Sequence, residues 1–560
     1  MPVSDHANSA AATMPAPARY VDLPDEREFS DAYSVFAAPR DRAVTVQLVR
    51  PFAVHSRNTY SAPVTPPIGM AYLGAVLEKA GYSVSVLDGL GDAINHLERS
   101  DCGRFQIQGL PQDDLVARID PACDVIGISL MFSQEWFLHR LFVDAVRNRN
   151  PDAVIVLGGE HPTAMPEFIL ESCTAVDAVV AGEGEMTMLE LVHRVAAGGD
   201  LGQIPGVFTR APDGSIVANG LSRRIKHLDD IPRPAWHLLN LDNFAIDNWT
   251  MGISKGRNLP IVATRGCPYQ CTFCSNPTMW TTRYLMRDPK DVVDEIEFLH
   301  SEYGATSIDF FDLTAIVKRE WTLDFCSELE RRGLAISWQL PSGTRSEALD
   351  EETLSAMKRT GCDFVVYAPE SGSAETLRLI KKKVKLDRIT ESIRTATRAG
   401  LVVKVNLIIG FPEERWRNVL ATYWFAVRLA LFGAADVNIS TFCPYPGSEI
   451  YRDLRECGEL PPPSDDYFRN LAVQFDFTSE FSVCRHVSGR ALSLVRFFGH
   501  STFYVLAYLT HPRRLARLAS SAFSEKFQPY NLFEQRVHDF IVRRRLIKAD
   551  AKSRADGGMA

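Results

Sequence analysis

The chain has 560 residues, of which 46% are hydrophobic and 23% are charged, and its formal net charge is −8. This length exceeds one ordinary domain, and the acidic balance argues against a nucleic-acid partner. The eleven cysteines are too few and too scattered for a disulfide scaffold, so we expect a protein of the reducing cytoplasm.

Residues 1–42 are rich in Ala, Pro, Asp and Ser and are predicted to form a flexible leader. The N-terminus lacks the basic and apolar regions of a secretory signal. No apolar run reaches the length that crosses a bilayer, so we expect no integral membrane span.

Residues 43–200 alternate between strand-like and helix-like segments. The expected strands cover residues 43–49, 83–88, 124–129, 153–157 and 178–181, and residues 67–80 are an expected helix. This alternation predicts a doubly wound, Rossmann-like parallel sheet. Residues 201–249 include a proline-rich extended stretch and are expected to connect this domain to the next.

Small and polar residues stand where these strands end. Ligands of doubly wound sheets bind outside the carboxyl ends of the strands, and glycine allows close approach to the backbone. We therefore expect a cofactor groove lined by Ser129, Gly158, Gly159, Glu160, Gly182 and Glu183. For any single glycine, a tight strand-to-helix turn is the simpler explanation.

Strand and helix segments alternate again over residues 250–450. The expected strands are 260–264, 307–313, 336–340, 364–369, 402–409 and 436–442, and the expected helices are 289–303, 322–332, 351–359, 374–380 and 388–399. Six βα units in succession predict a partial (β/α)6 barrel of the TIM type, with its active site at the carboxyl ends of the strands.

Three cysteines follow the first of these strands with the spacing C-x3-C-x2-C: Cys267, Cys271 and Cys274. Thiolates are soft ligands that suit iron–sulfur clusters, and three of them hold three corners of a [4Fe–4S] cubane. The fourth iron is then open to a small molecule. A zinc site, which usually has four ligands, and three ordinary buried cysteines are the alternatives.

The spacing, with Phe273 before the last cysteine, resembles the motif of the radical S-adenosylmethionine (SAM) enzymes. The upstream doubly wound domain makes the chain similar to the cobalamin-binding subfamily of these enzymes. Ser129 and the Gly158–Gly159 pair match the residues that line the nucleotide tail of cobalamin in that subfamily. The Asp-x-His-x-x-Gly pattern, whose histidine binds cobalt, is absent, so the resemblance implies cobalamin without a protein imidazole; a domain that kept the fold and lost the cofactor is the alternative.

The resemblance also implies which barrel residues contact SAM. Asp312 matches the position at the amino group, and Arg345, which follows Ser342, is placed to pair with the carboxylate. Glu370 and Ser371 begin a segment that resembles the family's Glu-Ser-Gly-Ser run near the ribose, and Asn406 begins the stretch beside the adenine. The expected strand that carries Asp312 ends in the run Asp309–Asp312. The plain alternatives are a surface ion pair for Arg345 and a helix cap for Asp309.

In this family, the resemblance implies a 5′-deoxyadenosyl radical that takes a hydrogen atom from the substrate, and methylcobalamin that supplies a methyl group. Methylation of an unactivated carbon, or of phosphorus, in a small molecule is therefore the leading hypothesis. The alternatives are an oxidative cyclase or ring-rearranging enzyme with the same cofactors, and a non-enzymatic cobalamin or redox sensor. The expected protein partner is an electron donor such as flavodoxin or ferredoxin.

Residues 451–560 are predicted to be mainly helical. The aromatic stretch 495–509 runs into the basic segment 511–517. A helix of this make-up either packs against a domain, which we favour, or lies on a membrane surface. No pattern in the sequence selects a particular substrate.

Overall fold

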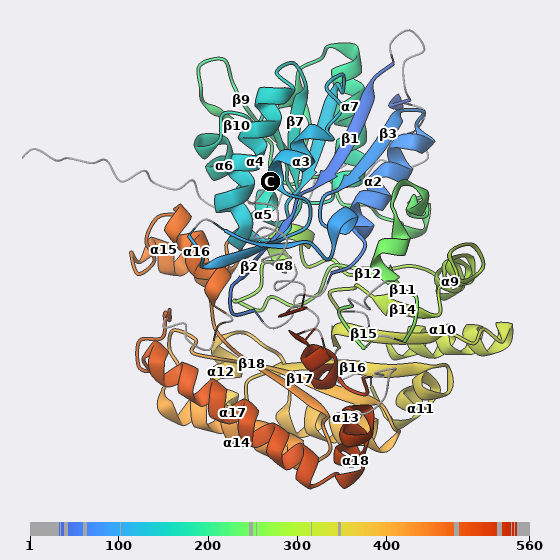
Figure 1. Cartoon of the computed structure of the whole chain (residues 1–560), viewed down its shortest axis with the longest axis vertical. Helices are drawn as coiled ribbons and strands as arrows, with labels where there is room; N and C mark the ends of the chain where they lie inside the picture. Colours follow the sequence, from blue (N-terminus) through green and yellow to red (C-terminus); the bar gives the residue numbers. More distant parts are fainter. Residues whose placement is uncertain are drawn as a thin grey trace, which may run out of the picture.

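The computed structural model describes residues 33, 35–37, 43–59, 64–100, 102–245, 250–253, 255–314, 316–344, 349–474, 476, 481–522, 529–538, 540–541 and 544–545. Figure 1 shows two α/β units, one above the other, with the C-terminal helices lying against both. The predicted leader lies almost entirely outside the described residues, and so does Arg345.

The first unit is built on a seven-stranded sheet in the order β10-β9-β8-β7-β6-β1-β3. Five of its strands are parallel: β1 (Thr45–Arg50), β3 (Ser83–Asp88), β6 (Val125–Ser129), β7 (Val154–Gly158) and β8 (Ala178–Val180). Its helices are α2 (Ile68–Lys79), α3 (Gln112–Ala117), α4 (Trp136–Arg149), α5 (Glu160–Ala164), α6 (Pro166–Ser172) and α7 (Gly184–Ala197). The order of the parallel strands is that of the flavodoxin-like doubly wound sheet, whose ligand site lies where the order reverses, beside β1 and β6.

Two additions to this unit were not expected. The antiparallel hairpin of β9 (Val207–Arg210) and β10 (Ile216–Ala218) extends the sheet beyond residue 200, into the range predicted to be a connector. A separate three-stranded sheet joins β2 (Ala53–Ser56), β4 (Leu97–Arg99) and β5 (Phe105–Gln108). The hairpin and the three-stranded sheet both consist of short strands. Their pairing depends on tertiary context, which local sequence patterns do not specify.

The second unit is a six-stranded, wholly parallel sheet that runs in sequence order. Its strands are β11 (Asn258–Ile261), β14 (Ser307–Phe310), β15 (Ser337–Thr344), β16 (Cys362–Glu370), β17 (Val402–Ile409) and β18 (Asp436–Thr441). The connecting helices include α9 (Pro289–Tyr303), α10 (Arg319–Arg332), α11 (Glu351–Arg359), α12 (Ala374–Leu379), α13 (Leu386–Arg398) and α14 (Trp416–Leu431). The predicted partial (β/α)6 barrel is confirmed.

Local chemistry explains why the helices begin and end where the sequence indicated. At the start of α9, the Asp288 side chain accepts a hydrogen bond from the Lys290 backbone N–H, and Pro289 occupies the first turn. The helix ends at Gly304 in the left-handed conformation, with φ of 65°. An acidic N-cap, an early proline and a terminal glycine are strong start and stop signals.

The C-terminal region divides between the two units. Helices α15 (Glu449–Glu456) and α16 (Asp465–Val473) lie beside the first unit, where Phe468 and Leu471 enter its core. Helix α17 (Gly489–Leu509) lies along α14 at the outer side of the barrel, followed by α18 (Pro512–Ala522). Packing of the aromatic stretch against a domain, the favoured prediction, is thus observed for one face of α17.

Candidate functional site

A cavity of about 350 Å³ lies between the two units and is lined by both. The first unit contributes strand ends, namely Ser129, Gly158, Gly159, Glu160, Gly182 and Glu183. The second contributes Thr264, Arg265 and Gly266, which directly precede the first cysteine of the predicted cluster loop, with Asp312 after β14. Tyr72, Met131, Met188, Met279, Trp280 and Phe311 supply an apolar lining. Residues that the sequence assigned to two different cofactors therefore share one chamber.

The two adjacent glycines where β7 ends, Gly158 in the strand and Gly159 directly after it, are conformationally different. A Cβ added at Gly158 would meet no atom within 4 Å, so the backbone there borders open space of the cavity. Gly159 has φ of 113°, and a Cβ there would lie 2.5 Å from the Leu130 carbonyl oxygen. Gly159 thus serves the turn, whereas Gly158 leaves room for a ligand, as a cobalamin tail requires.

The loop of Cys267, Cys271 and Cys274 follows the short strand β12 (Thr264–Arg265) and leads into α8 (Asn276–Trp280). Two of its sulfurs accept hydrogen bonds: the Asn276 backbone N–H donates to Cys274 Sγ at 3.4 Å, and the Thr314 hydroxyl donates to Cys267 Sγ at 3.5 Å. Hydrogen bonds to sulfur are a normal feature of iron–sulfur sites. The donor set fits a cluster.

In the described part of the chain, no three His, Cys, Asp or Glu side chains converge on one point as ligands of a single metal ion do. The three cysteines of a [4Fe–4S] site bind three different iron atoms, so they need not converge in this way.

A buried ion-pair network joins the first unit to the cluster loop. Arg265 Nη1 lies 3.3 Å from Glu183 Oε1, and its Nη2 lies 2.6 Å from Glu185 Oε1. Arg224 donates from Nε to the other oxygen of Glu183 at 3.0 Å. Burial opposes the charge on Arg265, but Glu185 and Glu183 outweigh it, so its pKa is raised. Both carboxylate oxygens of Glu183 are therefore engaged by arginines rather than left to a cofactor.

Glu160 makes a second link between the units. The Ser275 hydroxyl, directly after Cys274, donates to Glu160 Oε1. Burial raises the pKa of Glu160, and the hydrogen bond from Ser275 partly offsets this shift. The sequence placed Glu160 in the cofactor groove; its carboxylate turns out to hold the cluster loop as well.

Asp312 lies at the barrel side of the cavity and is fully buried. The Ala263 backbone N–H donates to its Oδ2 at 3.2 Å, whereas Oδ1 has no hydrogen-bond partner among the described residues. Burial raises the pKa of Asp312 to about 6, and hydrogen bonds from Thr264 and Ala263, which lower this pKa, offset only part of the shift. An unpartnered carboxylate oxygen in a cavity is suited to bind a cationic group.

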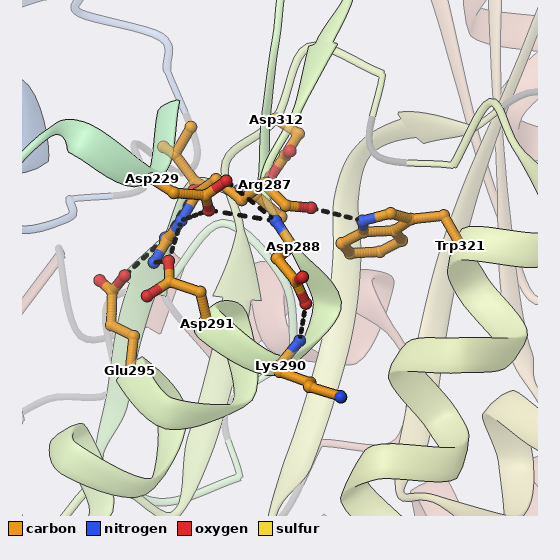
Figure 2. A network of polar contacts seen from close by, with 10 residues as sticks. Asp229, Arg287, Asp288, Lys290, Asp291, Glu295, Asp312 and Trp321 are labelled. Atoms are coloured by element: carbon orange, nitrogen blue, oxygen red, sulfur yellow. Dashed lines mark hydrogen bonds and ion pairs between the residues drawn. The ribbon is translucent and has the colours of Figure 1, made fainter. Parts of the chain in front are cut away.

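Figure 2 shows the network that supports this position. The Ala263 carbonyl accepts from the Arg287 backbone N–H at 2.9 Å, so Ala263 bridges Asp312 and Arg287. The Arg287 guanidinium pairs with Asp291 and with the buried Glu295, and Trp321 donates to the Arg287 carbonyl at 2.7 Å. This scaffold was not foreseen, because its partners come from three separate elements.

Glu370 ends β16 in the left-handed region, with φ of 69°, which is rare for a residue other than glycine. Lys382 Nζ donates to Glu370 Oε1 at 2.9 Å. The neighbouring Ser371 is fully buried, and its hydroxyl contacts that of Thr422 at 2.8 Å, behind the strand end. The strained backbone marks Glu370 as the functional candidate of this pair. The contact with Thr422 gives Ser371 a structural role.

Like Glu370 and Ser371, the remaining candidates from the barrel do not line the cavity. Asn406 lies on β17 beside Asn438 of β18, and its buried Oδ1 has no hydrogen-bond partner in the described part of the chain. Ser342 is exposed on β15. Arg345 lies outside the described residues, so its predicted pairing stays a prediction.

His161 is turned away from the cavity. Its Nδ1 lies 2.9 Å from the Ser133 hydroxyl, and its ring packs against Trp136 and Phe468. This agrees with the absence of the Asp-x-His-x-x-Gly pattern, since His161 offers no imidazole to a ligand in the chamber.

Family models match both halves of this architecture. Residues 57–192 match the B12 binding domain, and residues 261–426 match the Radical SAM superfamily. An uncharacterised methyltransferase of Pyrococcus horikoshii is 31% identical over 386 residues, covering 69% of this chain and 78% of the relative. The chain belongs to the cobalamin-binding radical SAM enzymes, whose cofactors are a [4Fe–4S] cluster, SAM and cobalamin.

Other relatives differ in their reactions. Cytidylyl-2-hydroxyethylphosphonate methyltransferase of Streptomyces wedmorensis is 30% identical, covering 72% of this chain and 80% of the relative. The anaerobic magnesium-protoporphyrin IX monomethyl ester cyclase of Rubrivivax gelatinosus is 28% identical, covering 72% and 69%.

The fold resembles solved structures of the same family. The radical SAM methyltransferase TsrM of Kitasatospora setae, with cobalamin and a [4Fe–4S] cluster bound, has a TM-score of 0.60 at 18% identity and covers 91% of this chain and all of its own. The cobalamin-dependent radical SAM enzyme OxsB, with cobalamin and SAM bound, has a TM-score of 0.62 at 15% identity, covering 93% and 82%. Among the described residues, no helix is long and apolar enough to cross a membrane.

Proposed function

We propose that this enzyme is a cobalamin-dependent radical SAM methyltransferase that adds a methyl group to an unactivated carbon, or to phosphorus, of a small molecule. The observation that carries the proposal is the shared chamber, in which Ser129 and Gly158 of the first unit face the cluster loop and Asp312 of the second. Methyl transfer to a carbon activated in the barrel requires the two cofactors to act on one substrate position.

When bound, the cluster supplies the electron that cleaves SAM, and cobalamin supplies the methyl group. Cys267, Cys271 and Cys274 would bind three irons. Asp312 would hold the amino group of SAM through its unpartnered oxygen, and Arg345 the carboxylate. Glu370 and Asn406 would contact the nucleoside; Ser371 and Ser342 would support it from behind.

In the first unit, Ser129, Gly158 and Gly182 would border the cobalamin tail, and Gly159 would set the turn. Glu160 and Glu183 would act as positioning residues, because their carboxylates contact Ser275 and the arginines of the network. We place the end of this domain after β10, at Ala218 rather than residue 200, since the hairpin continues its sheet.

A cytoplasmic location is part of the proposal. No disulfide joins the cysteines in the part of the chain that the structure describes, and Cys123, Cys173, Cys326, Cys362 and Cys443 are buried thiols. Reduced thiols and an iron–sulfur cluster both suit a reducing compartment.

Reconstituted enzyme, SAM and a chemical reductant, with extracts as a substrate source, test the proposal. We expect 5′-deoxyadenosine together with S-adenosylhomocysteine, which is the product left when SAM has given up its methyl group. Formation of S-adenosylhomocysteine should depend on cobalamin. Replacement of Cys271 by Ala should abolish both products and the visible absorbance of the cluster.

The cyclase relatives support a second candidate, an oxidative ring closure with the same cofactors. It predicts 5′-deoxyadenosine without S-adenosylhomocysteine, and a product that has lost hydrogens without gaining carbon. Absence of both nucleosides would favour a sensor.

A further inference from the structure

A basic surface next to the cluster loop carries the first inference, which rests on the proposed function. This donor surface, as we call it, is residues 378–388, with the cations Arg378, Lys381, Lys382, Lys383, Lys385 and Arg388. Five of these line an open depression of about 520 Å³ between α12 and α13: Arg378, Lys382, Lys383, Lys385 and Arg388. In a chain of net charge −8, such a cluster is a local reversal of sign.

The donor surface is in direct contact with the cluster loop. The Thr272 backbone N–H donates to the Ile380 carbonyl at 3.1 Å, and Phe273 belongs to the same small core as Leu377 and Ile380. Lys382 Nζ lies 6.0 Å from the centre of the Phe273 ring. Since residues 272 and 273 stand between Cys271 and Cys274, the donor surface packs directly on the part of the loop that joins two of the cluster cysteines.

Its composition fits a transient protein interface. The six cations of the segment outnumber Asp387, its one acidic residue, and two of them pair with acidic residues outside it, Lys381 with Glu449 and Lys382 with Glu370. Leu379 is 47% exposed between them. An apolar centre with a charged rim, beside a redox centre, is what a weak electron-transfer complex uses, and the charges steer the encounter.

We propose that the donor surface docks the electron donor, a small acidic one-electron carrier such as a flavodoxin or ferredoxin. The carrier loses one electron and the cluster gains one; no proton or other atom crosses the interface. The hydrogen bond from the Thr272 backbone N–H to the Ile380 carbonyl ties this surface to the cluster loop.

The test compares two electron sources for the reconstituted full-length enzyme. We expect Lys383→Glu/Lys385→Glu to raise about tenfold the concentration of reduced flavodoxin that gives the half-maximal rate of 5′-deoxyadenosine formation at low salt. The rate with titanium(III) citrate should stay within about twofold, because a small reductant needs no docking. A matched control, Arg99→Glu/Arg104→Glu on the exposed edge of the first unit, should behave as the wild type with both sources.

Wild-type dependence on flavodoxin in the Lys383→Glu/Lys385→Glu variant would overturn the docking surface, and so would an equal loss with titanium(III). A wild-type enzyme that forms no 5′-deoxyadenosine with either source would instead remove the proposed function.

The outer face of α14 and α17 carries a second, independent inference. The solvent side of α17 is apolar, with Leu494, Phe497, Phe498, Val505 and Leu509 between 53% and 69% exposed. Helix α14 presents Trp416, Leu420, Trp424 and Leu431, between 45% and 60% exposed. Tyr423 and Thr502 hydrogen-bond at 2.9 Å where the two helices meet, so the two stripes flank one seam.

The helices that form this face carry charges of one sign, although Arg417 of α14 pairs with Glu375 of α12. Neither α14 nor residues 481–524 contain an Asp or Glu, although acidic residues number 69 in the chain. The exposed charges on these helices are arginines, among them Arg428, Arg490, Arg513 and Arg517. Two copies of such a face would repel each other, whereas anionic lipid headgroups complement it.

We infer that this face rests on an anionic bilayer surface, with its aromatic and aliphatic side chains in the interfacial layer. Helices that bind in the plane of a membrane interface typically carry Trp and Phe on one side and basic residues around them. Helices α14 and α17 have this composition. Such binding is peripheral and needs no membrane-crossing helix.

Vesicle co-sedimentation of the full-length enzyme tests this inference. We expect binding to vesicles of phosphatidylcholine with phosphatidylglycerol, about tenfold weaker binding to phosphatidylcholine alone, and quenching of tryptophan fluorescence by lipids brominated in the upper chain. Phe497→Ser/Phe498→Ser/Val505→Ser should abolish binding, while Leu141→Ser, at a leucine of α4 that is 47% exposed, should not. No binding by the wild type, binding unchanged in the triple variant, or a dimer that the triple variant dissolves would overturn the inference.

Discussion

Single side chains that line the chamber are fixed by hydrogen bonds and ion pairs to residues behind them. Asp312 is the best example, because one carboxylate oxygen accepts from the Ala263 backbone and the other has no hydrogen-bond partner among the described residues. Arg287 fixes Ala263 in turn and neutralises Glu295. The site is therefore preorganised before any cofactor binds.

The affinity for SAM should depend on pH through Asp312. Burial raises the pKa of this carboxyl to about 6, so it is ionised above that pH and neutral below it. We expect the dissociation constant of SAM to rise about fourfold between pH 7.5 and 5.5, since only the ionised form pairs with the ammonium group. Equilibrium dialysis with the clustered enzyme measures it; Asp312→Asn should bind weakly and without this pH step.

Arg287 should be a large contributor to stability. Its replacement by Met leaves the carboxylate of Glu295 buried without its partner, which we expect to lower the free energy of unfolding by about 3–5 kcal/mol. Urea unfolding followed by circular dichroism gives the value. The double variant Arg287→Met/Glu295→Leu should recover most of the loss; no recovery would show that the pair is not the cause.

At the scale of elements, the turn from β7 into α5 combines Gly159, whose positive φ the turn requires, with Gly158, which borders the open space of the cavity. The loop of the cysteines has a similar division, since one side faces the chamber and the other packs on α12 through Phe273. Strand ends thus position ligand contacts, and the helices that follow fix the strand ends.

A pair of alanine substitutions separates the two glycines. Gly159→Ala should destabilise the protein, because its φ of 113° and the Leu130 carbonyl leave no room for a Cβ. Gly158→Ala should fold with wild-type stability, since its Cβ would meet no protein atom, yet bind cobalamin at least about tenfold more weakly if the tail approaches there. Thermal unfolding of the apo protein and titration with cobalamin distinguish them; unchanged affinity in Gly158→Ala would place the tail elsewhere.

For the whole molecule, the two domains and most barrel elements could be predicted from the sequence. Strand and helix alternation is local, and α9 and α11 have the predicted bounds because caps and periodicity specify them. The cysteines and the glycines were evident for the same reason. Arg265 and Glu185 were both in view as sequence, but their pairing across domains depends on tertiary docking. For the same reason, the sequence predicted Glu183 as a cofactor contact, whereas in the folded chain its carboxylate pairs with Arg224 and Arg265.

Arg265 should couple the two domains. In Arg265→Met, Glu183 and Glu185 lose a shared cation in a buried setting, and we expect faster hydrogen exchange at residues 182–186 and 264–280. Exchange in β16 and β17, inside the barrel sheet, should not change. Mass spectrometry after hydrogen exchange measures both; equal acceleration everywhere would indicate global destabilisation instead.

The central claim is that one chain holds both cofactors around one chamber. Anaerobic purification followed by reconstitution, a visible spectrum and metal analysis tests it most directly. We expect about four iron atoms and one cobalt per chain, with the iron lost and the cobalt kept in Cys271→Ala. Iron without cobalt after reconstitution with cobalamin would contradict the assignment of the first domain, and cobalt without iron would contradict the cluster.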